Sequence, residues 1–520
     1  MLKLTVPGLG PRSSDAIETR PKWVRAWLER LPFAHPTEAA RQLTATLAEM
    51  NRTPLDEAAR YRCLTLMHPV IMRLAASIEP LLAESGVPPG RNSRQAGELL
   101  RELWLELGYG YKRVLLSLIG KRSGLGGGQR FVDVTTRLLL VMRNLQFACY
   151  QTYSPPPRGL WREMHHLYLF AHEAGFADKA AAENGISASL IYRQALLMAL
   201  ADPHHLEPEA LQQTRRYLKK HAALAQLTTR HDPCRNKCFL ILSDADCPSS
   251  PALEGATQRA LGLRTDRLCQ HLLEAGSRLN SGDTPRTLGL PDGLGGEFGH
   301  HLLQRLQKSW NGRSPRAYRR HPAAAASLRL VAGVTAVHRM LVNQGTPEET
   351  ESPGTLTITG LDSVLAATPV PQASTWRLVN DSAGGLALTT RPEAPLNLKI
   401  GDPLALQENT PGNWSLGVIR WIRMRDDQQM EMGVERLSPQ IEPVWIRPVR
   451  KRRLDRAEPA LLVRGVPAQK RRDCLLLPRD LYQSSRDAEL LHAQHLDCIT
   501  LGQRVEQSPS YDLVEFSRFQ

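Results

Sequence analysis

The chain has 520 residues, of which 42% are hydrophobic and 23% are charged, and its formal net charge is +14. These proportions are typical of globular proteins and exclude a mainly disordered or fibrous chain, while the length exceeds that of one compact core and predicts several domains. No apolar stretch approaches the roughly 18 to 20 residues of a membrane-spanning helix, and the first residues lack the pattern of a signal peptide.

The 8 cysteines are spread thinly along the chain. Their density is far below that of a disulfide scaffold, so we expect reduced thiols and a cytoplasmic protein. The positive charge favours an anionic partner, but it does not choose among nucleic acid, a lipid surface and a phosphorylated ligand.

Residues 1–305 are predicted to form an all-α domain, because apolar residues recur at helical spacing. The first helix is expected to begin near Pro36, with Thr37 as its N-cap. The short breaks between helices are compatible with a repeat-like stack, although no consensus recurs at a fixed period. The further predicted helices cover Tyr61–Glu84, Ser93–Leu107, Val132–Tyr150, Arg158–Ala174, Ser187–Ala201, Glu207–Leu227 and Ala256–Leu279.

A glycine-rich segment, Asp292–Gly299, is predicted to be a loop near the end of this helical domain. Beyond it we expect two β domains, residues 306–448 and 449–520. Short, partly alternating stretches predict a small antiparallel barrel in the first and a C-terminal β module in the second. These stretches are Trp376–Val379, Leu386–Thr389, Pro403–Leu406, Leu416–Ile422, Met430–Val434, Ala460–Val466, Cys474–Leu477, Ala488–His492, Cys498–Val505 and Tyr511–Phe516.

Two polar motifs stand before and within the first strands of the predicted barrel. Arg316 and Arg320 are four residues apart, so their guanidinium groups can converge on one anion or on the O6/N7 edge of guanine. Asn380, Ser382 and Gly385 form an Asn-x-Ser-x-x-Gly pattern, expected to be a tight turn with polar donors and a close backbone approach. Each motif alone is common, as a solvated helix face or as a turn. Together they offer donors that suit a guanine dinucleotide.

The order Arg-x-x-x-Arg, then Asn-x-Ser-x-x-Gly, at the start of a small barrel resembles the PilZ domain, a bacterial receptor for cyclic di-GMP. The resemblance covers roughly residues 310–445 and continues through Leu398–Leu406, Trp414–Trp421 and Met432–Leu437. The gap of about 60 residues between the motifs is longer than is usual in that family, and we interpret it as an insertion in or after the first strand.

The resemblance implies roles for individual residues. Arg316 and Arg320 would clasp the guanine edges and phosphates of cyclic di-GMP, while Asn380, Ser382 and Gly385 would line the barrel surface beneath it. Secondary candidates are Arg313, Arg319 and Asp381.

The resemblance also implies a receptor or adaptor, not an enzyme, in motility, pilus or biofilm control. Ligand binding would order the arginine segment, and the helical domain would bind a protein partner. Apart from the ligand cyclic di-GMP we expect no cofactor and no nucleic-acid polymer, because no helix-turn-helix or aromatic-basic platform is evident. The alternative is a degenerate PilZ-like scaffold that binds no nucleotide.

Metal sites are not expected. His231, Cys234, Cys238 and Cys247 lack the paired spacing of a structural zinc site. Glu163-x-x-His166 has the spacing of half a di-iron site, but no second half is evident. No nucleophile elbow or kinase motif is present either.

Overall fold

The computed structural model describes residues 2–10, 18–83, 86–120, 128–182, 185–228, 238–250, 260–312, 318–322, 326–344, 371–392, 396–408, 412–425, 429–450, 453–454, 457–465, 472–479, 481–484, 486–492 and 495–518. The chain folds into two compact units. The first holds Met1–Ser85 and Pro89–Pro315, and the second holds Gly86–Pro88 and Arg316–Gln520.

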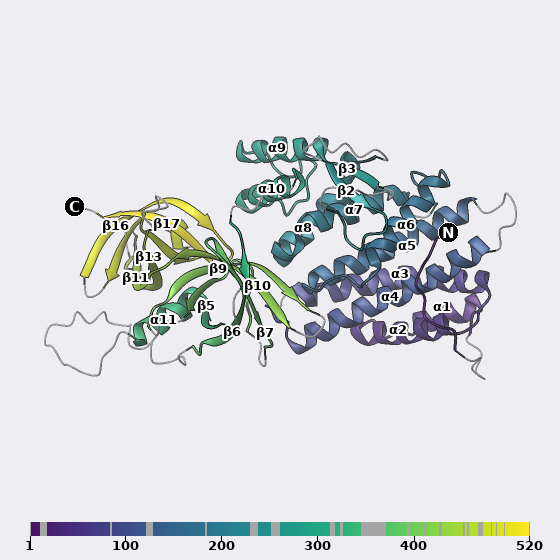
Figure 1. Cartoon of the computed structure of the whole chain (residues 1–520), viewed down its shortest axis with the longest axis horizontal. Helices are drawn as coiled ribbons and strands as arrows, with labels where there is room; N and C mark the ends of the chain where they lie inside the picture. The colour runs from purple at the N-terminus through teal and green to yellow at the C-terminus, as the bar shows by residue number, and fades with distance from the viewer. Residues whose placement is uncertain are drawn as a thin grey trace. The chain divides into compact units, whose positions relative to one another are not determined.

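The first unit is mainly helical, as predicted. Its main contacts from α1 to α8 join helices that are first or second neighbours along the chain, which agrees with a stacked array. Figure 1 shows this stack in purple to teal. The helices are α1 (Pro21–Glu29), α2 (Pro36–Arg52), α3 (Glu57–Ala83), α4 (Arg91–Gly120), α5 (Gly128–Gln151), α6 (Leu160–Glu173), α7 (Ala188–Leu200), α8 (Pro208–His221), α9 (Asp266–Asn280) and α10 (Gly296–Trp310).

The predicted start of α2 is off by two residues. His35, not Thr37, is the N-cap, and Pro36 occupies the first helical position. Proline suits that position because its fixed φ matches the helix and its missing N–H would have had no partner there. At α7, by contrast, Ser187 is a true N-cap, and its Oγ accepts a hydrogen bond from the Leu190 N–H at 3.2 Å.

The first unit also contains a small antiparallel sheet that the helical pattern did not predict. Its order is β1 (Gln226–Thr228), β3 (Ala260–Arg264), β2 (Cys238–Leu242). The helix predicted over Ala256–Leu279 therefore begins only at Asp266, because β3 occupies the residues before it.

The glycine-rich segment predicted as a loop is in part helical. Gly296–Gly299 form the first turn of α10, which buries Leu302, Leu303 and Leu306. The helix continues past residue 305 to Trp310, whose indole N–H donates to the Leu197 carbonyl at 2.9 Å.

The second unit begins with a small antiparallel barrel, as predicted. The strand order β4-β6-β5-β8-β9-β10-β7 closes on itself because β6 also pairs with β7. β4 pairs with β6 beyond the end of β5, so it lies beside the ring and is not one of its members. The strands are β4 (His321–Pro322), β5 (Ser327–Ala332), β6 (Ser374–Ser382), β7 (Gly385–Thr390), β8 (Pro403–Gln407), β9 (Ser415–Met424) and β10 (Met430–Ser438).

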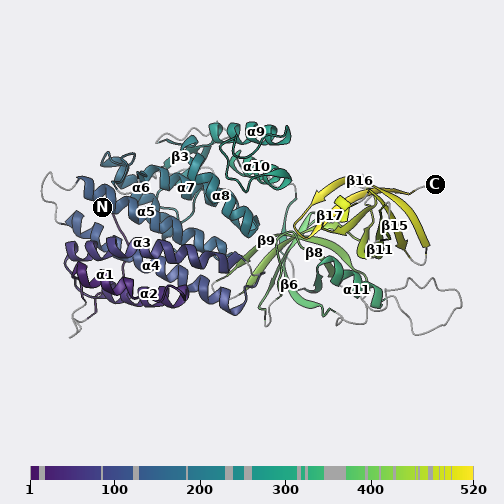
Figure 2. The same ribbon diagram turned by 180° about the vertical axis from the view of Figure 1, so that it is seen from behind.

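The C-terminal β module is a second closed antiparallel sheet, in the order β12-β11-β13-β14-β17-β16-β15 with β11 also paired to β15. Only two residues separate it from β10, because β10 ends at Ser438 and β11 starts at Ile441. Figure 2 shows its yellow strands beside the green strands of the first barrel. The strands are β11 (Ile441–Arg450), β12 (Arg453–Leu454), β13 (Glu458–Val463), β14 (Cys474–Pro478), β15 (Asp487–His492), β16 (His495–Gln507) and β17 (Tyr511–Arg518).

One hydrophobic cluster spans the two barrels, and the second barrel has a further cluster of its own. The long gap between the two motifs supplies β5 and then α11 (Val334–Gln344), which contacts β5 and β8 of the first barrel and β11, β13 and β14 of the second. α11 is therefore an internal part of this unit, and burying its apolar face holds the barrels together. The shared cluster includes Val331, Val334, Val337, Met340, Leu416, Val418, Leu461, Leu476 and Tyr511.

Candidate functional site

The Asn-x-Ser-x-x-Gly motif forms the tip of the β6–β7 hairpin. We predicted a turn throughout the motif, but Asn380, Asp381 and Ser382 are the last residues of β6, and only the two residues that follow make the turn. Ser382 pairs with Gly385 across the hairpin, and the Ser382 hydroxyl donates to the Gly385 carbonyl at 3.0 Å. The three polar side chains of β6 are half-buried, so they remain accessible to a ligand.

The segment that follows Arg316 lies directly beside this hairpin. In β4, His321 pairs with Asp381 and Pro322 pairs with Asn380. Arg319 and Arg320 immediately precede β4, and both are exposed. The strand pairing thus brings the second arginine of the Arg-x-x-x-Arg motif to the edge that carries the Asn-x-Ser motif. Arg313 and Arg316 lie outside the described residues.

Two glycines allow close approaches at this hairpin. A Cβ on Gly384 would lie 2.7 Å from Cδ2 of Tyr318, so the aromatic ring packs directly on the turn. A Cβ on Gly385 would lie 2.3 Å from the carbonyl oxygen of Val434 in β10. Backbone therefore requires glycine at position 385, whereas at position 384 only the Tyr318 side chain stands in the way of a Cβ.

Arg436 of β10 is a third basic residue at the hairpin, which the sequence motifs did not identify. Its backbone N–H donates to the Gly384 carbonyl at 3.2 Å. Its guanidinium group lies 3.5 Å from Asp381 and also pairs with Glu408. Burial opposes the charged form, but the hydrogen bonds and charges of Glu408 and Asp381 outweigh it and raise the pKa of Arg436. The only hint in the sequence was its position in the Met432–Leu437 strand.

The structure thus gathers Asn380, Asp381, Ser382 and Gly385 at one hairpin, with Arg319 and Arg320 on the adjoining segment. This geometry offers amide, hydroxyl and carboxylate groups beside exposed guanidinium groups. Their part in ligand binding stays a prediction.

The weaker candidates have structural partners. Glu163 pairs with Lys112 at 2.5 Å and accepts a hydrogen bond from the Thr5 N–H at 2.6 Å, while His166 lies 3.1 Å from Asp244. His231 and Cys234 lie outside the described residues. Among the residues that are described, no group of three or more His, Cys, Asp or Glu side chains could hold a metal ion.

Comparison with known proteins identifies the class of the barrel. Residues 364–443 match the family model described as "Cyclic-di-GMP receptor FimW, middle PilZ domain". The barrel therefore contains a PilZ domain, as the two motifs predicted. The match begins after α11, so the arginine motif and β5 precede the region that the model covers.

The remaining domains match models of the same receptor. Residues 22–232 match "Cyclic-di-GMP receptor FimW, N-terminal domain", and residues 444–519 match "FimW C-terminal beta-barrel domain". A curated protein of Pseudomonas aeruginosa, named "Cyclic-di-GMP receptor FimW", is 24% identical over 574 residues, which cover 99% of this chain and 93% of that protein. The chain is thus similar to FimW along its whole length, and these models describe domains of a cyclic di-GMP receptor.

A solved structure titled "MrkH, A novel c-di-GMP dependence transcription regulatory factor" also matches. It is 8% identical, with a TM-score of 0.12, and the match covers 28% of this chain and 73% of that one. This likeness is too weak to carry an argument.

None of the helices in the described ranges is both long and apolar enough to span a bilayer.

Proposed function

We propose that this protein is a cytoplasmic receptor for cyclic di-GMP, which senses the nucleotide and does not act on it chemically. The PilZ match and the similarity to a protein named as a cyclic di-GMP receptor support this function. The observation that carries it is the β4–β6 pairing, because it brings Arg319 and Arg320 close to Asn380 and Asp381.

The chemistry of the hairpin suits a guanine dinucleotide with two phosphates. In this proposal Arg316 and Arg320 bind phosphate oxygens and guanine edges with their planar donor groups. Asn380 and Ser382 contribute amide and hydroxyl groups from the barrel surface, and Gly385 keeps that surface flat. Arg436 has a different role: it is already paired with Asp381 and Glu408, so it positions Asp381 at the hairpin.

Binding would order the arginine segment against the barrel, and this change would reach a protein partner of the helical unit. A nucleic-acid polymer is not part of this proposal. Motility, pilus or biofilm control is proposed as the process by analogy with PilZ proteins.

The proposal is tested by calorimetric titration of the full chain with cyclic di-GMP beside GTP and cyclic di-AMP. We expect selective binding of cyclic di-GMP that weakens as salt rises, because charged contacts are screened. Arg316→Ala and Arg320→Ala should each weaken binding at least about tenfold, as expected for a lost charged hydrogen bond of about 1.4 kcal/mol or more.

The matched control is Arg423→Ala. Arg423 is also an exposed arginine of this barrel, but it lies on β9, three strands from β6 in either direction around the ring. The Arg423→Ala variant should bind cyclic di-GMP with the same affinity as the unaltered protein. Equal loss in all three variants would point to a general charge effect and contradict the arginine clasp.

The alternative function is a PilZ-like scaffold that binds no nucleotide. It predicts no heat at protein concentrations that detect a micromolar site. That result would overturn the receptor function and leave the barrel fold unchanged.

A further inference from the structure

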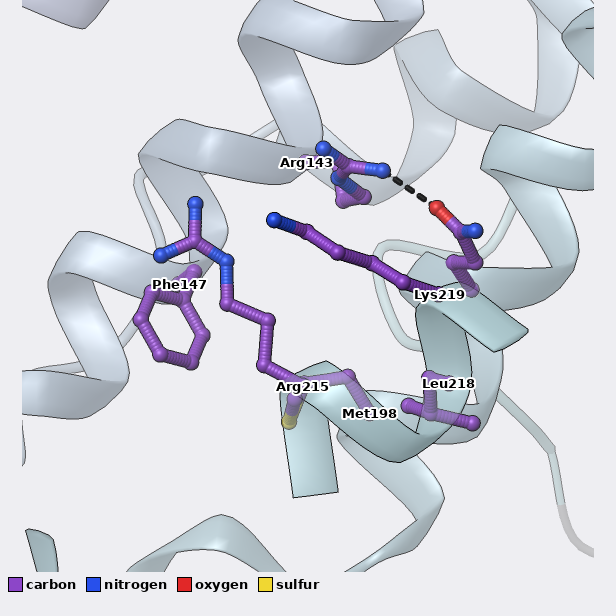
Figure 3. Close-up of a pocket in the computed structure, with 7 residues that line it drawn as sticks. Arg143, Phe147, Met198, Arg215, Leu218 and Lys219 are labelled. Atoms are coloured by element: carbon purple, nitrogen blue, oxygen red, sulfur yellow. Dashed lines mark hydrogen bonds between the residues drawn. The ribbon is translucent and has the colours of Figure 1, made fainter. Parts of the chain in front are cut away.

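The helical unit contains a hollow lined by three helices and far from the PilZ motifs in sequence. Its volume is about 290 Å³, including space open to solvent. Arg143 and Phe147 come from α5, Gln194 and Met198 from α7, and Arg215, Leu218 and Lys219 from α8. In Figure 3 the charged ends of Arg143, Arg215 and Lys219 point toward one another above the apolar side chains.

The hollow carries an excess of positive charge. Three of its lining side chains are cationic, and the carboxylate that pairs with them is Glu79 of α3, whose two oxygens lie 2.8 and 2.9 Å from Arg215 Nη1. Arg143, Arg215 and Lys219 with Glu79 therefore sum to two positive charges. Within the described residues Lys219 forms no ion pair or hydrogen bond.

Besides the Glu79 carboxylate, neutral groups hold the two guanidinium groups in place. Arg143 donates to the Gln194 side chain and, at 3.2 Å, to the Asn144 amide oxygen. Arg215 stacks over Phe147, with its Cζ 4.1 Å from the ring centroid. Gln194 and Phe147 are themselves buried. Preorganised donors of this kind bind an oxyanion with little loss of conformational entropy.

The cations also destabilise one another. Burial, with the nearby Arg215 charge, lowers the pKa of Arg143 to about 9. Burial and the charges of Arg215 and Arg143 lower the pKa of Lys219, against the opposing effect of Glu79. Such a cluster is costly unless an anion neutralises it, so its presence needs an explanation beyond packing.

We propose that this hollow binds the dianionic phosphate group of a small soluble phosphomonoester. A phosphate dianion matches the two excess charges, and arginine forks match its oxygens. The apolar side chains of the lining, Phe147, Met198 and Leu218, give a small organic part a surface to rest on.

The test is binding of inorganic phosphate to the full chain, followed by calorimetry and by ³¹P NMR line broadening. Arg316 and Arg320 are replaced by alanine in every sample, so that the proposed cyclic di-GMP site does not contribute. We expect one saturable site. Lys219→Gln should raise its Kd about tenfold, since one charged hydrogen bond is lost.

Two further variants separate this site from general charge effects. Lys220→Gln removes one positive charge from the next residue of α8. The Lys220 ammonium group is directed at the carbonyls of Gly289 and Leu290, so the Kd of this variant for phosphate should not change. Glu79→Gln removes the competing carboxylate and should lower the Kd several-fold.

The Kd for phosphate should rise in Lys219→Gln and fall in Glu79→Gln only if phosphate lies among these groups. If the two residues had a merely structural role, the two substitutions would not change the Kd in opposite directions. Absence of saturable phosphate binding would overturn the proposal. So would equal weakening by Lys219→Gln and Lys220→Gln. Because Arg316 and Arg320 are replaced by alanine in every sample, the result does not depend on the cyclic di-GMP proposal.

Discussion

The ring of Tyr318 packs on Gly384, at a distance that leaves no room for a Cβ atom. Tyr318 lies two residues beyond Arg316 and two before Arg320, and Gly384 is the turn of the β6–β7 hairpin. Together with the β4–β6 pairing, this contact holds the residues before β4 against the hairpin. Because Tyr318 is 52% exposed, the ring can move away without opening the core.

We therefore predict that Gly384→Ala weakens cyclic di-GMP binding several-fold while the barrel remains folded. The new methyl group displaces Tyr318, so the residues before β4 lose this side-chain contact with the hairpin and keep only the β4–β6 pairing. The measurement is a double-mutant cycle with Tyr318→Ala, read by calorimetry. A coupling energy of about 1 kcal/mol is expected, typical of residues in contact.

If the two substitutions prove additive, the glycine acts on binding by another route. A loss of stability in Gly384→Ala alone would have the same implication, and urea unfolding of each variant checks it.

The neighbouring glycine gives the opposite result. At Gly385 a Cβ would meet the Val434 carbonyl oxygen at 2.3 Å, and that backbone belongs to β10 of the same barrel. Backbone cannot move aside as an exposed ring can, so Gly385→Ala should destabilise the second unit by about 2 kcal/mol. Urea unfolding measures this loss. A midpoint equal to that of Gly384→Ala would show that the hairpin relaxes freely.

The sequence predicted the barrel strands well because each is short, partly alternating and bounded by turn residues. Ile422, for example, is fully buried while the next residue of the same strand, Arg423, is exposed. The helix α10 was missed because its first turn is Gly296–Gly299. Glycine disfavours helices in general, but a Cβ on Gly299 would lie 2.1 Å from the Leu294 carbonyl, so here the helix needs it.

The candidate site was predicted only in part. The motif residues identified the β6–β7 hairpin and the segment before β4, since both are local patterns. Arg436 could not be found in this way, because it is more than 50 residues from Asp381 in sequence and meets it only through the β10–β7–β6 pairings. The position of α11 between the barrels also depends on tertiary packing, and no local signal shows it.

A polar cluster joins the two barrels and should add to their stability. Arg420 of β9 bonds Glu506 of β16 at 2.6 and 3.0 Å and Glu435 of β10 at 2.6 Å, and the Tyr511 hydroxyl donates to Glu506 at 3.0 Å. Burial opposes the charge of Arg420, but the bonds and charge of Glu506 outweigh it and raise the pKa of Arg420. Arg420→Ala should cost about 2 kcal/mol, because Glu506 loses its counter-ion.

The matched control is Arg518→Ala, at the end of β17. Arg518 pairs with Asp497 at 3.2 Å, but the two side chains are 53% and 34% exposed, so this ion pair should contribute no more than about 0.5 kcal/mol. Urea unfolding followed by tryptophan fluorescence compares the two variants. Equal midpoints would mean that the Arg420 cluster contributes no more than a surface ion pair.

The last prediction concerns acid stability and rests on His338 of α11. This side chain is fully buried in the second unit, and its ring lies edge-on to Trp445 with centroids 4.6 Å apart. Burial lowers its pKa from 6.5 to about 4, although the Val444 backbone partly favours the protonated ring. His338 is therefore neutral in the folded protein well below pH 6.5.

The direction of the effect follows from proton binding. Above pH 6.5 the ring is neutral in both the folded and the unfolded chain, so His338 does not make stability depend on pH. Between pH 6.5 and 4 the unfolded chain binds a proton that the folded chain does not, so the free energy of unfolding falls as the pH falls. Over this window the loss attributable to His338 is about 3 kcal/mol.

His338→Phe keeps an aromatic ring but removes the titrating group. Urea unfolding of the second unit at several pH values between 6.5 and 4.5 should show a shallower loss of stability for this variant than for the unaltered protein. Parallel curves would mean that the His338 ring is protonated equally in the folded and unfolded states. Water would then have to reach the ring in the folded protein, and α11 could not form a closed part of the core between the barrels.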